Sequence, residues 1–337
     1  MRALVITAPG RAEVQEVSAP TPGRGEVVVD VDRAGICGTD IEIFHGEMAY
    51  LRSGHARFPM RIGHEWTGVV ASVGEGTDTG WIGRRVMGDT MLGCGSCRRC
   101  RRGNQHVCAQ RHELGIRGGR PGALAEQVAV PVSSLHELPG DLDPAVGAVI
   151  EPAGNALRAV EGAQLVPGDR VLILGPGTIG LLCALLARAA GAEVHLLGVT
   201  RASMDVARGL GFEHVWTEQT LPELPIDAVI DAATSAELPA RALQLVEPGG
   251  RVVCIGLASS ASLIDTRELV LGDLTVVGVL SASPGLSGAI AAFTSGGVDP
   301  RPLVAATIGL DEVAQVLAGE RPTGAGPGPK IHIDPRR

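Results

Sequence analysis

Lysine is almost absent from this sequence, since Lys330 is the only lysine among 29 basic residues. Tyrosine is as scarce: Tyr50 stands alone, and the residue four positions later is Gly54. The lack of lysine argues against a Schiff base and excludes a Walker phosphate loop, which requires Gly-Lys-Ser/Thr. Together the two scarcities exclude the tyrosine–lysine pair by which some enzymes activate an alcohol.

Aromatic residues and long apolar runs are also in short supply. Aromatic side chains make up 2% of the chain and the formal net charge is −8, so we expect no nucleic-acid partner. The longest apolar region, Val171–Val199, is interrupted by Gly175-Pro176-Gly177 and contains Arg188 and Glu193. We therefore expect no membrane span, and with no signal-peptide pattern after Met1 we expect a soluble cytoplasmic protein.

The 337 residues suggest two domains with different textures. Up to about residue 150, short strand-like runs such as 26–31 and 67–73 alternate with Gly/Pro turns, which predicts a small β-barrel. From residue 168 buried strands alternate with helices, and this pattern is typical of a doubly wound parallel sheet. The predicted segments are the strands 170–174, 193–197, 228–231 and 252–256 and the helices 178–190, 202–210 and 236–246. A last strand over 330–333 is expected to return to the first domain.

Four of the seven cysteines form one dense pattern, Cys94-x2-Cys97-x2-Cys100-x7-Cys108. Tetrahedral Zn²⁺ accepts four thiolates and then has no position left for a substrate, so the pattern indicates a structural zinc site. An iron–sulfur cluster or unrelated surface thiols are the alternatives. The interspersed arginines are compatible with a nucleic-acid-binding zinc ribbon, but the acidic chain favours a solvent-exposed lobe. Free thiols of this number suit a reducing compartment.

A second set of metal donors is dispersed along the chain. Cys37 lies in Gly-Ile-Cys-Gly-Thr-Asp, His64 in Gly-His-Glu, and Glu151 follows at the start of the second half. Cys, His and Glu are all zinc ligands, and three of them leave a fourth position open for a substrate. Taken singly, each has a plainer interpretation as a buried cysteine, a core histidine or a surface carboxylate, and spacing alone leaves both open.

The segment from Gly175 to Gly180 fits G-x-G-x-x-G between a predicted strand and a predicted helix. This context indicates a dinucleotide site in which the glycines provide the tight turn, the approach to pyrophosphate and the helix–strand packing. An ordinary glycine-rich turn is the alternative. The candidate cofactor residues here are Gly175, Gly177, Thr178, Ile179 and Gly180.

The cofactor prediction favours NADP over NAD. An NAD site usually carries an acidic residue about twenty positions further on, whereas this chain has Gly198, followed by Thr200 and Arg201. A glycine removes the carboxylate that would repel a 2′-phosphate, and arginine can bind that phosphate. NAD remains the alternative if Arg201 only faces solvent.

In this order and combination the motifs resemble those of the zinc-dependent medium-chain alcohol/polyol dehydrogenases, along essentially the whole chain. The branch that includes threonine, sorbitol, glucose and aminocyclitol dehydrogenases is the most similar. The resemblance implies an α/β architecture: a GroES-like β-barrel catalytic domain over 1–153 and 290–337, with a zinc lobe at about 93–110, and a doubly wound Rossmann domain over 154–289. It also implies one catalytic and one structural zinc ion, and a homo-oligomer, either a dimer or a tetramer.

The same resemblance assigns roles around the catalytic metal. Asp40 corresponds to the carboxylate that orients His64, and Thr39 to the hydroxyl that takes the substrate proton. The implied catalytic zinc ligands are Cys37, His64 and Glu151, with Glu65 as the adjacent carboxylate that approaches or exchanges with the metal.

The chain departs from the family pattern at the outer end of the proton relay. Many relatives have a histidine five residues after the first cysteine, where this chain has Glu42, and His45 follows three residues later. Residues 46–62 look longer than usual and are expected to shape the substrate entrance. Glu113 is a weaker candidate for binding a substrate hydroxyl or amine.

The sequence therefore predicts an oxidoreductase that transfers hydride between a secondary alcohol of a polyol, sugar or aminocyclitol and NAD(P). L-Threonine 3-dehydrogenase is the alternative within the family. A cofactor-binding protein without turnover is the alternative of another class.

Overall fold

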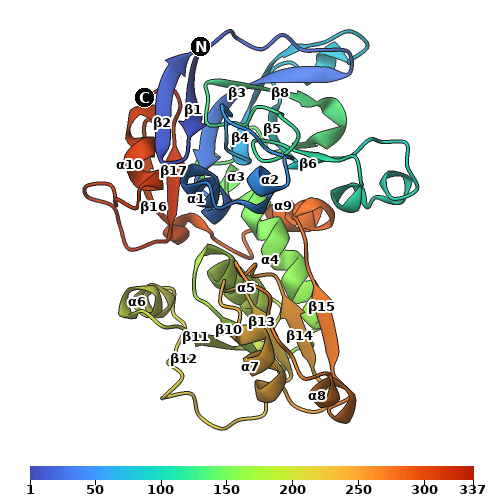
Figure 1. The fold of residues 1–337 in the computed structure, drawn as a ribbon, viewed down its shortest axis with the longest axis vertical. Helices are drawn as coiled ribbons and strands as arrows, with labels where there is room; N and C mark the ends of the chain where they lie inside the picture. The colour runs from blue at the N-terminus through green and yellow to red at the C-terminus, as the bar shows by residue number, and fades with distance from the viewer. The chain divides into compact units, whose positions relative to one another are not determined.

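The computed structural model describes residues 1–337 and forms two compact units (Figure 1). The first unit comprises Met1–Glu151 and Leu303–Arg337, and the second comprises Pro152–Pro302. The second unit extends beyond the expected boundary at residue 289 because helix α9 (Leu286–Thr294) packs on helix α4 (Ile150–Ala163). An added Cβ on Gly288 would lie 2.4 Å from Leu157 Cδ2, so these helices are in close contact.

The first unit is built on a seven-stranded sheet with the order β16-β17-β3-β4-β5-β9, to which β8 adds by pairing with β3. The long central strand β3 pairs antiparallel with β4, β8 and the C-terminal β17. Strand β17, red in Figure 1, thus lies beside the blue strand β3. The strands are β3 (Glu26–Gly35), β4 (Glu65–Val73), β5 (Arg85–Gly88), β8 (Gln127–Pro131), β9 (Leu135–Glu137), β16 (Val304–Ile308) and β17 (Lys330–Ile333).

The side chains of β17 alternate between the two faces of the sheet, so this strand contributes both to the apolar core and to a buried polar face. Successive side chains of a strand point to opposite faces. Ile331 and Ile333 belong to the apolar core with Ile43, while Lys330 and His332 lie on the other face, also buried. The first unit also contains two separate two-stranded sheets, β1 (Arg2–Ala8) with β2 (Arg11–Glu16) and β6 (Met91–Leu92) with β7 (His112–Glu113). Its helices are α1 (Gly38–His45), α2 (Ala49–Arg52), α3 (Pro144–Gly147) and α10 (Val313–Leu317).

The second unit is a six-stranded parallel sheet with the order β12-β11-β10-β13-β14-β15. Leu172 and Val229 pack with the helix α7, whereas Ile173 and Val253 face α5 and α4 on the opposite side. Helices on both faces confirm the predicted doubly wound sheet. The elements are β10 (Arg170–Leu174), α5 (Thr178–Ala189), β11 (Glu193–Leu197), α6 (Arg201–Gly209), β12 (Val215–Trp216), β13 (Ala228–Asp231), α7 (Leu238–Leu245), β14 (Arg251–Cys254), α8 (Thr266–Leu271) and β15 (Thr275–Gly278).

Helix α7 begins two residues later than the apolar pattern predicted, at Leu238 instead of Ala236. Pro239 occupies its first turn, where a helix has no use for the missing backbone N–H, so the helix starts there. None of the helices combines the length and the apolar character that crossing a membrane requires.

Candidate functional site

Three of the dispersed donors meet in the first unit. The ligand atoms of Cys37, His64 and Glu65 all lie within 4.8 Å of one another. Cys37 occupies the turn between β3 and α1, while His64 immediately precedes β4 and Glu65 begins it. Because β3 and β4 pair with Gly35 opposite Glu65, the sheet register brings these two turns to the same edge.

Asp40 fastens the two turns to each other. Its Oδ2 accepts a hydrogen bond from the Cys37 backbone N–H at 2.9 Å, and its Oδ1 accepts one from the Gly63 N–H at 3.3 Å. The carboxylate is fully buried, so little water competes for these charge-assisted bonds, and the shorter one, to Cys37, is the stronger. Asp40 Oδ1 also lies 3.7 Å from His64 Nδ1, longer than a hydrogen bond. In this geometry Asp40 positions His64 mainly through the backbone.

The charge around His64 favours its protonated form when no metal is bound. Burial would lower the pKa of His64, but the Asp40 carboxylate and Cys37 raise it well above the ordinary value. A metal ligand must be deprotonated, so metal and proton compete for this imidazole.

Lys330 also contacts the site, a role that no sequence motif indicated. Its Nζ donates hydrogen bonds to Glu65 Oε1 at 2.8 Å, Glu65 Oε2 at 2.7 Å and the Ile36 carbonyl at 2.9 Å. Burial acts to lower the pKa of Lys330, and Glu65 outweighs it and raises the pKa. The only local sequence feature that indicated a buried Lys330 was the alternating Lys-Ile-His-Ile pattern of β17. The carboxylate of Glu65 is thereby held by an ammonium group on one side.

Gly35 makes room for this arrangement. A Cβ on residue 35 would lie 2.2 Å from Glu65 Oε2, closer than any real contact. The first glycine of Gly-Ile-Cys-Gly-Thr-Asp is therefore required, because any side chain there would clash with the Glu65 carboxylate.

Thr90 connects Glu151 to the turn that carries His64. Glu151 is buried in the first turn of α4, and the Thr90 hydroxyl lies 3.4 Å from Glu151 Oε1 and 3.3 Å from the His64 carbonyl. Sequence reasoning missed Thr90, which follows β5 and carries no motif. Half-buried Thr39 and Glu42 occupy neighbouring positions, three residues apart, on α1, and His45 at the end of that helix is exposed.

The donor set fits zinc. A thiol, an imidazole and carboxylates are ligands that Zn²⁺ accepts, and Cys37 is a free cysteine. The buried Nδ1 of His64 has no hydrogen-bond partner within the protein, so this polar centre is incomplete as a purely protein structure.

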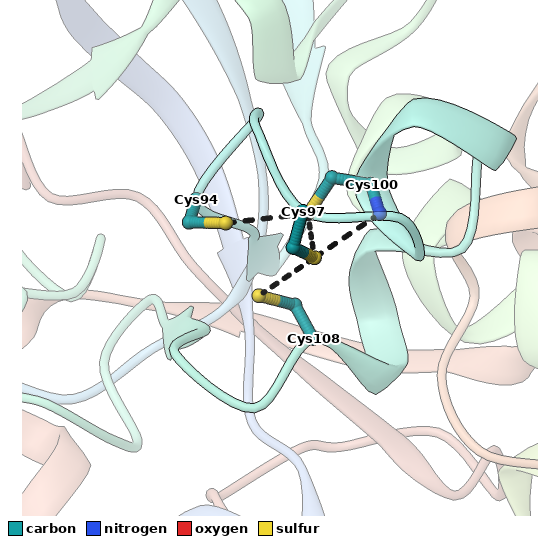
Figure 2. Close-up of side chains that lie close together, drawn as sticks. All are labelled: Cys94, Cys97, Cys100 and Cys108. Atoms are coloured by element: carbon teal, nitrogen blue, oxygen red, sulfur yellow. Dashed lines mark hydrogen bonds between the residues drawn. The ribbon is translucent and has the colours of Figure 1, made fainter.

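The four clustered cysteines converge in a separate lobe, and Figure 2 shows their sulfurs facing one another. The Sγ–Sγ distances are 3.5 Å for Cys97–Cys100, 3.8 Å for Cys97–Cys108 and 4.0 Å for Cys94–Cys100. Four thiolates at about 2.3 Å from a tetrahedral zinc are about 3.8 Å apart. Hydrogen bonds from the backbone of Ser96 and Cys97 lower the pKa of Cys94 to about 6, which favours the thiolate. The lobe fits a four-thiolate zinc ion.

The glycine-rich turn of the second unit has the form that a dinucleotide requires. Gly175 has φ +89°, and a Cβ on Gly180 would lie 2.0 Å from the Gly175 carbonyl oxygen. Gly177, at the start of α5, has open space where its Cβ would be. Thr178 and Ile179 form the first turn of α5, whose free N–H groups can bind a pyrophosphate.

The residues predicted to select NADP lie at the end of β11. A Cβ on Gly198 would lie 2.9 Å from Pro176 Cγ and from Met204 Cγ, so packing also requires this glycine. Thr200 caps α6 through its hydroxyl, which accepts from the Ser203 N–H at 3.3 Å. The Arg201 side chain is 93% exposed and lies 3.6 Å from Asp205, so it is free to turn toward a ligand.

Glu113 is buried and already engaged. Its Oε1 accepts hydrogen bonds from the Tyr50 hydroxyl at 2.9 Å and from Arg111 Nε at 2.8 Å. These bonds join α2 to the strand that leaves the cysteine lobe. A substrate that contacts Glu113 has to share it with both partners.

A third cluster of metal donors, on β11 and immediately before β12, is satisfied without a metal. His195 Nδ1 accepts a hydrogen bond from Trp216 Nε1 at 3.1 Å, and His195 Nε2 lies 2.9 Å from Glu193 Oε1. The neutral ring therefore carries its proton on Nε2 and donates it to Glu193. His214 only stacks on this ring, at 4.5 Å between centroids. Both ring nitrogens of His195 are occupied, so this cluster is structural.

Residues 23–140 match the family model for the alcohol dehydrogenase GroES-like domain, and residues 178–295 match that for zinc-binding dehydrogenases. L-Threonine 3-dehydrogenase from Deinococcus radiodurans is 32% identical over 330 residues, which cover 94% of this chain and 93% of the relative. These matches confirm the predicted fold class.

Solved structures of similar proteins cover 99% of this chain. An Escherichia coli alcohol dehydrogenase complexed with NADH has a TM-score of 0.89 at 26% identity, and covers 99% of both chains. A Sinorhizobium meliloti protein described as a zinc-binding dehydrogenase, bound to NADP, has a TM-score of 0.89 at 30% identity and the same coverage. Galactitol-1-phosphate dehydrogenase from Escherichia coli has a TM-score of 0.87 at 25% identity, over all of that chain. Both nicotinamide cofactors thus occur among structures that this chain resembles.

Proposed function

Since this chain belongs to the zinc-dependent medium-chain dehydrogenases, we propose that it oxidises a secondary alcohol of a polyol, sugar or aminocyclitol to the ketone. The reaction is a reversible hydride transfer to a nicotinamide dinucleotide. The observation that carries the proposal is the group formed by half-buried Cys37 and the buried residues His64 and Glu65, whose ligand atoms lie within 4.8 Å of one another.

Cys37, His64 and Glu151 would hold the catalytic zinc, with Glu65 beside them. When bound, zinc supplies a Lewis acid that lowers the pKa of the substrate hydroxyl, and the nicotinamide supplies the hydride acceptor. Lys330 donates a hydrogen bond to each carboxylate oxygen of Glu65, so its ammonium charge offsets the charge of this carboxylate beside the proposed zinc ligands.

Asp40 and Thr39 complete the proposed machinery. Asp40 keeps the Cys37 and Gly63 turns at a fixed separation through its two backbone hydrogen bonds. Thr39 Oγ1 would accept the substrate proton and pass it outward. Glu42 lies three residues further along the same helix, and burial together with Glu47 raises its pKa.

The direct test is Cys37→Ser, compared with Cys254→Ser in the second unit. We expect the first variant to lose zinc from the catalytic site while the cysteine lobe stays loaded, and to lose turnover. The control variant should keep the zinc of both sites and its turnover. Full turnover of Cys37→Ser without that zinc would contradict the proposal.

For the cofactor we propose NADP, because Gly198 stands where an NAD site usually has a carboxylate, and the exposed Arg201 three residues further on can bind a 2′-phosphate. Arg201→Asp should weaken NADP binding and leave NAD binding nearly unchanged, as measured by fluorescence titration. Arg11→Asp in the first unit serves as the control. A preference of the unaltered protein for NAD would show the choice to be wrong.

The substrate class is tested by cofactor absorbance with polyols, sugars, cyclitols and L-threonine. The similarity to the Deinococcus radiodurans enzyme makes L-threonine the second candidate, and faster turnover of L-threonine than of every polyol would establish it. Absence of turnover with zinc and cofactor both bound would favour a cofactor-binding protein instead.

We also place the protein in the cytoplasm, as a dimer or tetramer. Seven free cysteines suit a reducing compartment, in which the zinc thiolates stay unoxidised. Light scattering of the zinc-loaded protein tests the oligomeric state.

A further inference from the structure

The first unit contains a pocket of about 420 Å³ whose lining includes no residue of the metal centre. Three segments form it: the β1–β2 region, residues 56–61 and residues 116–121. The lining residues are Val5, Gln15, Val17, Ser18, Ala56, Arg57, Pro59, Met60, Arg61, Ile116, Arg117, Gly119, Arg120 and Pro121. Four of them are arginines and none is acidic.

Backbone hydrogen bonds fix these segments around the pocket. Met60 and Ile6 exchange bonds of 2.9 and 3.0 Å, which fasten the second segment to β1. The Gly118 N–H donates to the His55 carbonyl at 2.9 Å, and the Gly122 N–H donates to the Arg61 carbonyl at 3.0 Å. The pocket is thus preformed, as sites for small molecules usually are.

The positive charge of the lining is only partly balanced by the protein. Arg120 forms an ion pair with Glu26 at 2.7 Å, and the Arg117 guanidinium stacks over the Tyr50 ring at 5.3 Å. The side chains of Arg57 and Arg61 have no ion pair or hydrogen bond. Four arginines therefore share one carboxylate.

Arg61 makes this imbalance costly. It is half-buried, and burial lowers its pKa, which means that its charge has lost hydration without gaining a counter-ion. An anion would restore the lost interaction through charge-assisted hydrogen bonds, which guanidinium groups form in pairs with phosphate oxygens. Val5, Val17 and Ile116 offer an apolar wall beside the charges for the remainder of the ligand.

We propose that this pocket binds a small phosphorylated organic molecule at a site separate from the zinc and dinucleotide sites. A dianionic phosphate matches several arginines better than a single carboxylate does. The volume lies in the range typical of small-molecule sites and is too small for a polymer. This inference goes beyond the proposed alcohol oxidation and does not depend on it.

The test is calorimetric titration of ribose 5-phosphate into the zinc-loaded protein with its dinucleotide site saturated by NADP. We expect saturable binding of one molecule per chain, and much weaker binding of ribose. The double variant Arg57→Gln, Arg61→Gln should raise the dissociation constant about tenfold or more, the effect of losing about one charge-assisted contact. Zinc content and alcohol turnover are measured separately, so failure of the proposed reaction is a distinguishable result.

The matched control is Arg98→Gln, Arg101→Gln, which removes the same charge from exposed positions of the cysteine lobe. Equal weakening by both double variants would show general electrostatic attraction and overturn the proposal. So would equal binding of ribose, or no saturable binding. If the first double variant fails to fold, Arg61→Lys replaces it, and it should weaken binding because lysine keeps the charge without the paired donors.

Discussion

Lys330 is buried at 3% exposure and faces Glu65 at 1% exposure, 265 residues away in the chain. Ionised groups so deeply buried are stable only as a pair, since each alone would lose hydration without compensation. Taking out the ammonium alone would leave the carboxylate in the interior beside Cys37. The only lysine of the chain is therefore a structural partner of Glu65, beside the proposed zinc ligands.

We expect Lys330→Met to lower the free energy of unfolding by about 3–5 kcal/mol at pH 7, as measured by urea denaturation, because Glu65 is left unpaired. The double variant Lys330→Met, Glu65→Gln removes both charges and should recover part of the loss. Because the pKa of Lys330 is raised, the pair persists from neutral pH upward until that pKa is approached. A loss below about 1 kcal/mol, typical of an exposed ion pair, would contradict this account.

His332 lies two residues further on β17, with neither ring nitrogen hydrogen-bonded. Burial, with the nearby charges of Lys330 and Arg33, lowers the pKa of His332 to about 3. Below about pH 6.5 the unfolded chain therefore takes up a proton that the folded protein excludes. The free energy of unfolding consequently decreases as the pH is lowered. At pH 5 this effect makes the free energy of unfolding about 2 kcal/mol smaller than at pH 8.

His332→Leu should remove this share of the acid sensitivity. The measurement is the free energy of unfolding at pH 5 and pH 8, and His45→Gln, at an exposed position, is the control. An unchanged pH dependence in the leucine variant would show that His332 does not titrate as described.

At the scale of elements, the cysteine lobe carries little apolar core of its own. Between β6 and β7 the chain forms only the short 3-10 helices η2 (Cys100–Arg102) and η3 (Gln105–Val107), and Cys108 is the single buried cysteine of the four. A segment of this size would depend on the proposed zinc ion for a fixed structure.

Cys97→Ser should therefore lower the zinc content by one ion per chain and make the lobe the first site of proteolysis. The Cys97 sulfur lies 3.5 Å from that of Cys100 and 3.8 Å from that of Cys108. The sheets of both units should remain folded, as judged by circular dichroism. Cys254→Ser is the control, and a full zinc content in Cys97→Ser would exclude the four-thiolate site.

At the scale of the whole molecule, each unit has a core of its own. Trp66, Ile43 and Leu4 lie in the core of the first unit, and Leu172, Val229 and Leu243 in that of the second. The metal donors belong to the first unit and the glycine-rich turn to the second. Ligands that bind only the folded state stabilise the unit that holds them.

Calorimetry should thus resolve two unfolding transitions that respond to different ligands. NADP at about 100 times its dissociation constant should stabilise one transition by about 2.7 kcal/mol, and zinc chelation should lower the other. A single transition moved equally by both ligands would show that the two units unfold together.

Local patterns were sufficient for much of the fold. The strands 170–174, 193–197, 228–231 and 330–333 lie at the predicted residues, because each is a short apolar or alternating run between clear turn signals. The cysteine spacing and the glycine motif are equally local, since a single turn places all their atoms.

Contacts between distant segments depended on tertiary structure. The pairing of β17 with β3 brings Lys330 to Glu65, and packing of residues 56–61 against 116–121 gathers the arginines of the pocket. No sequence period links residues so far apart, because sheet register and side-chain packing determine which of many charged residues meet. The sequence by itself determined the strands, the cysteine lobe and the dinucleotide turn. The tertiary structure decided which buried charges form pairs, because sheet pairing and packing between distant segments bring those charges together.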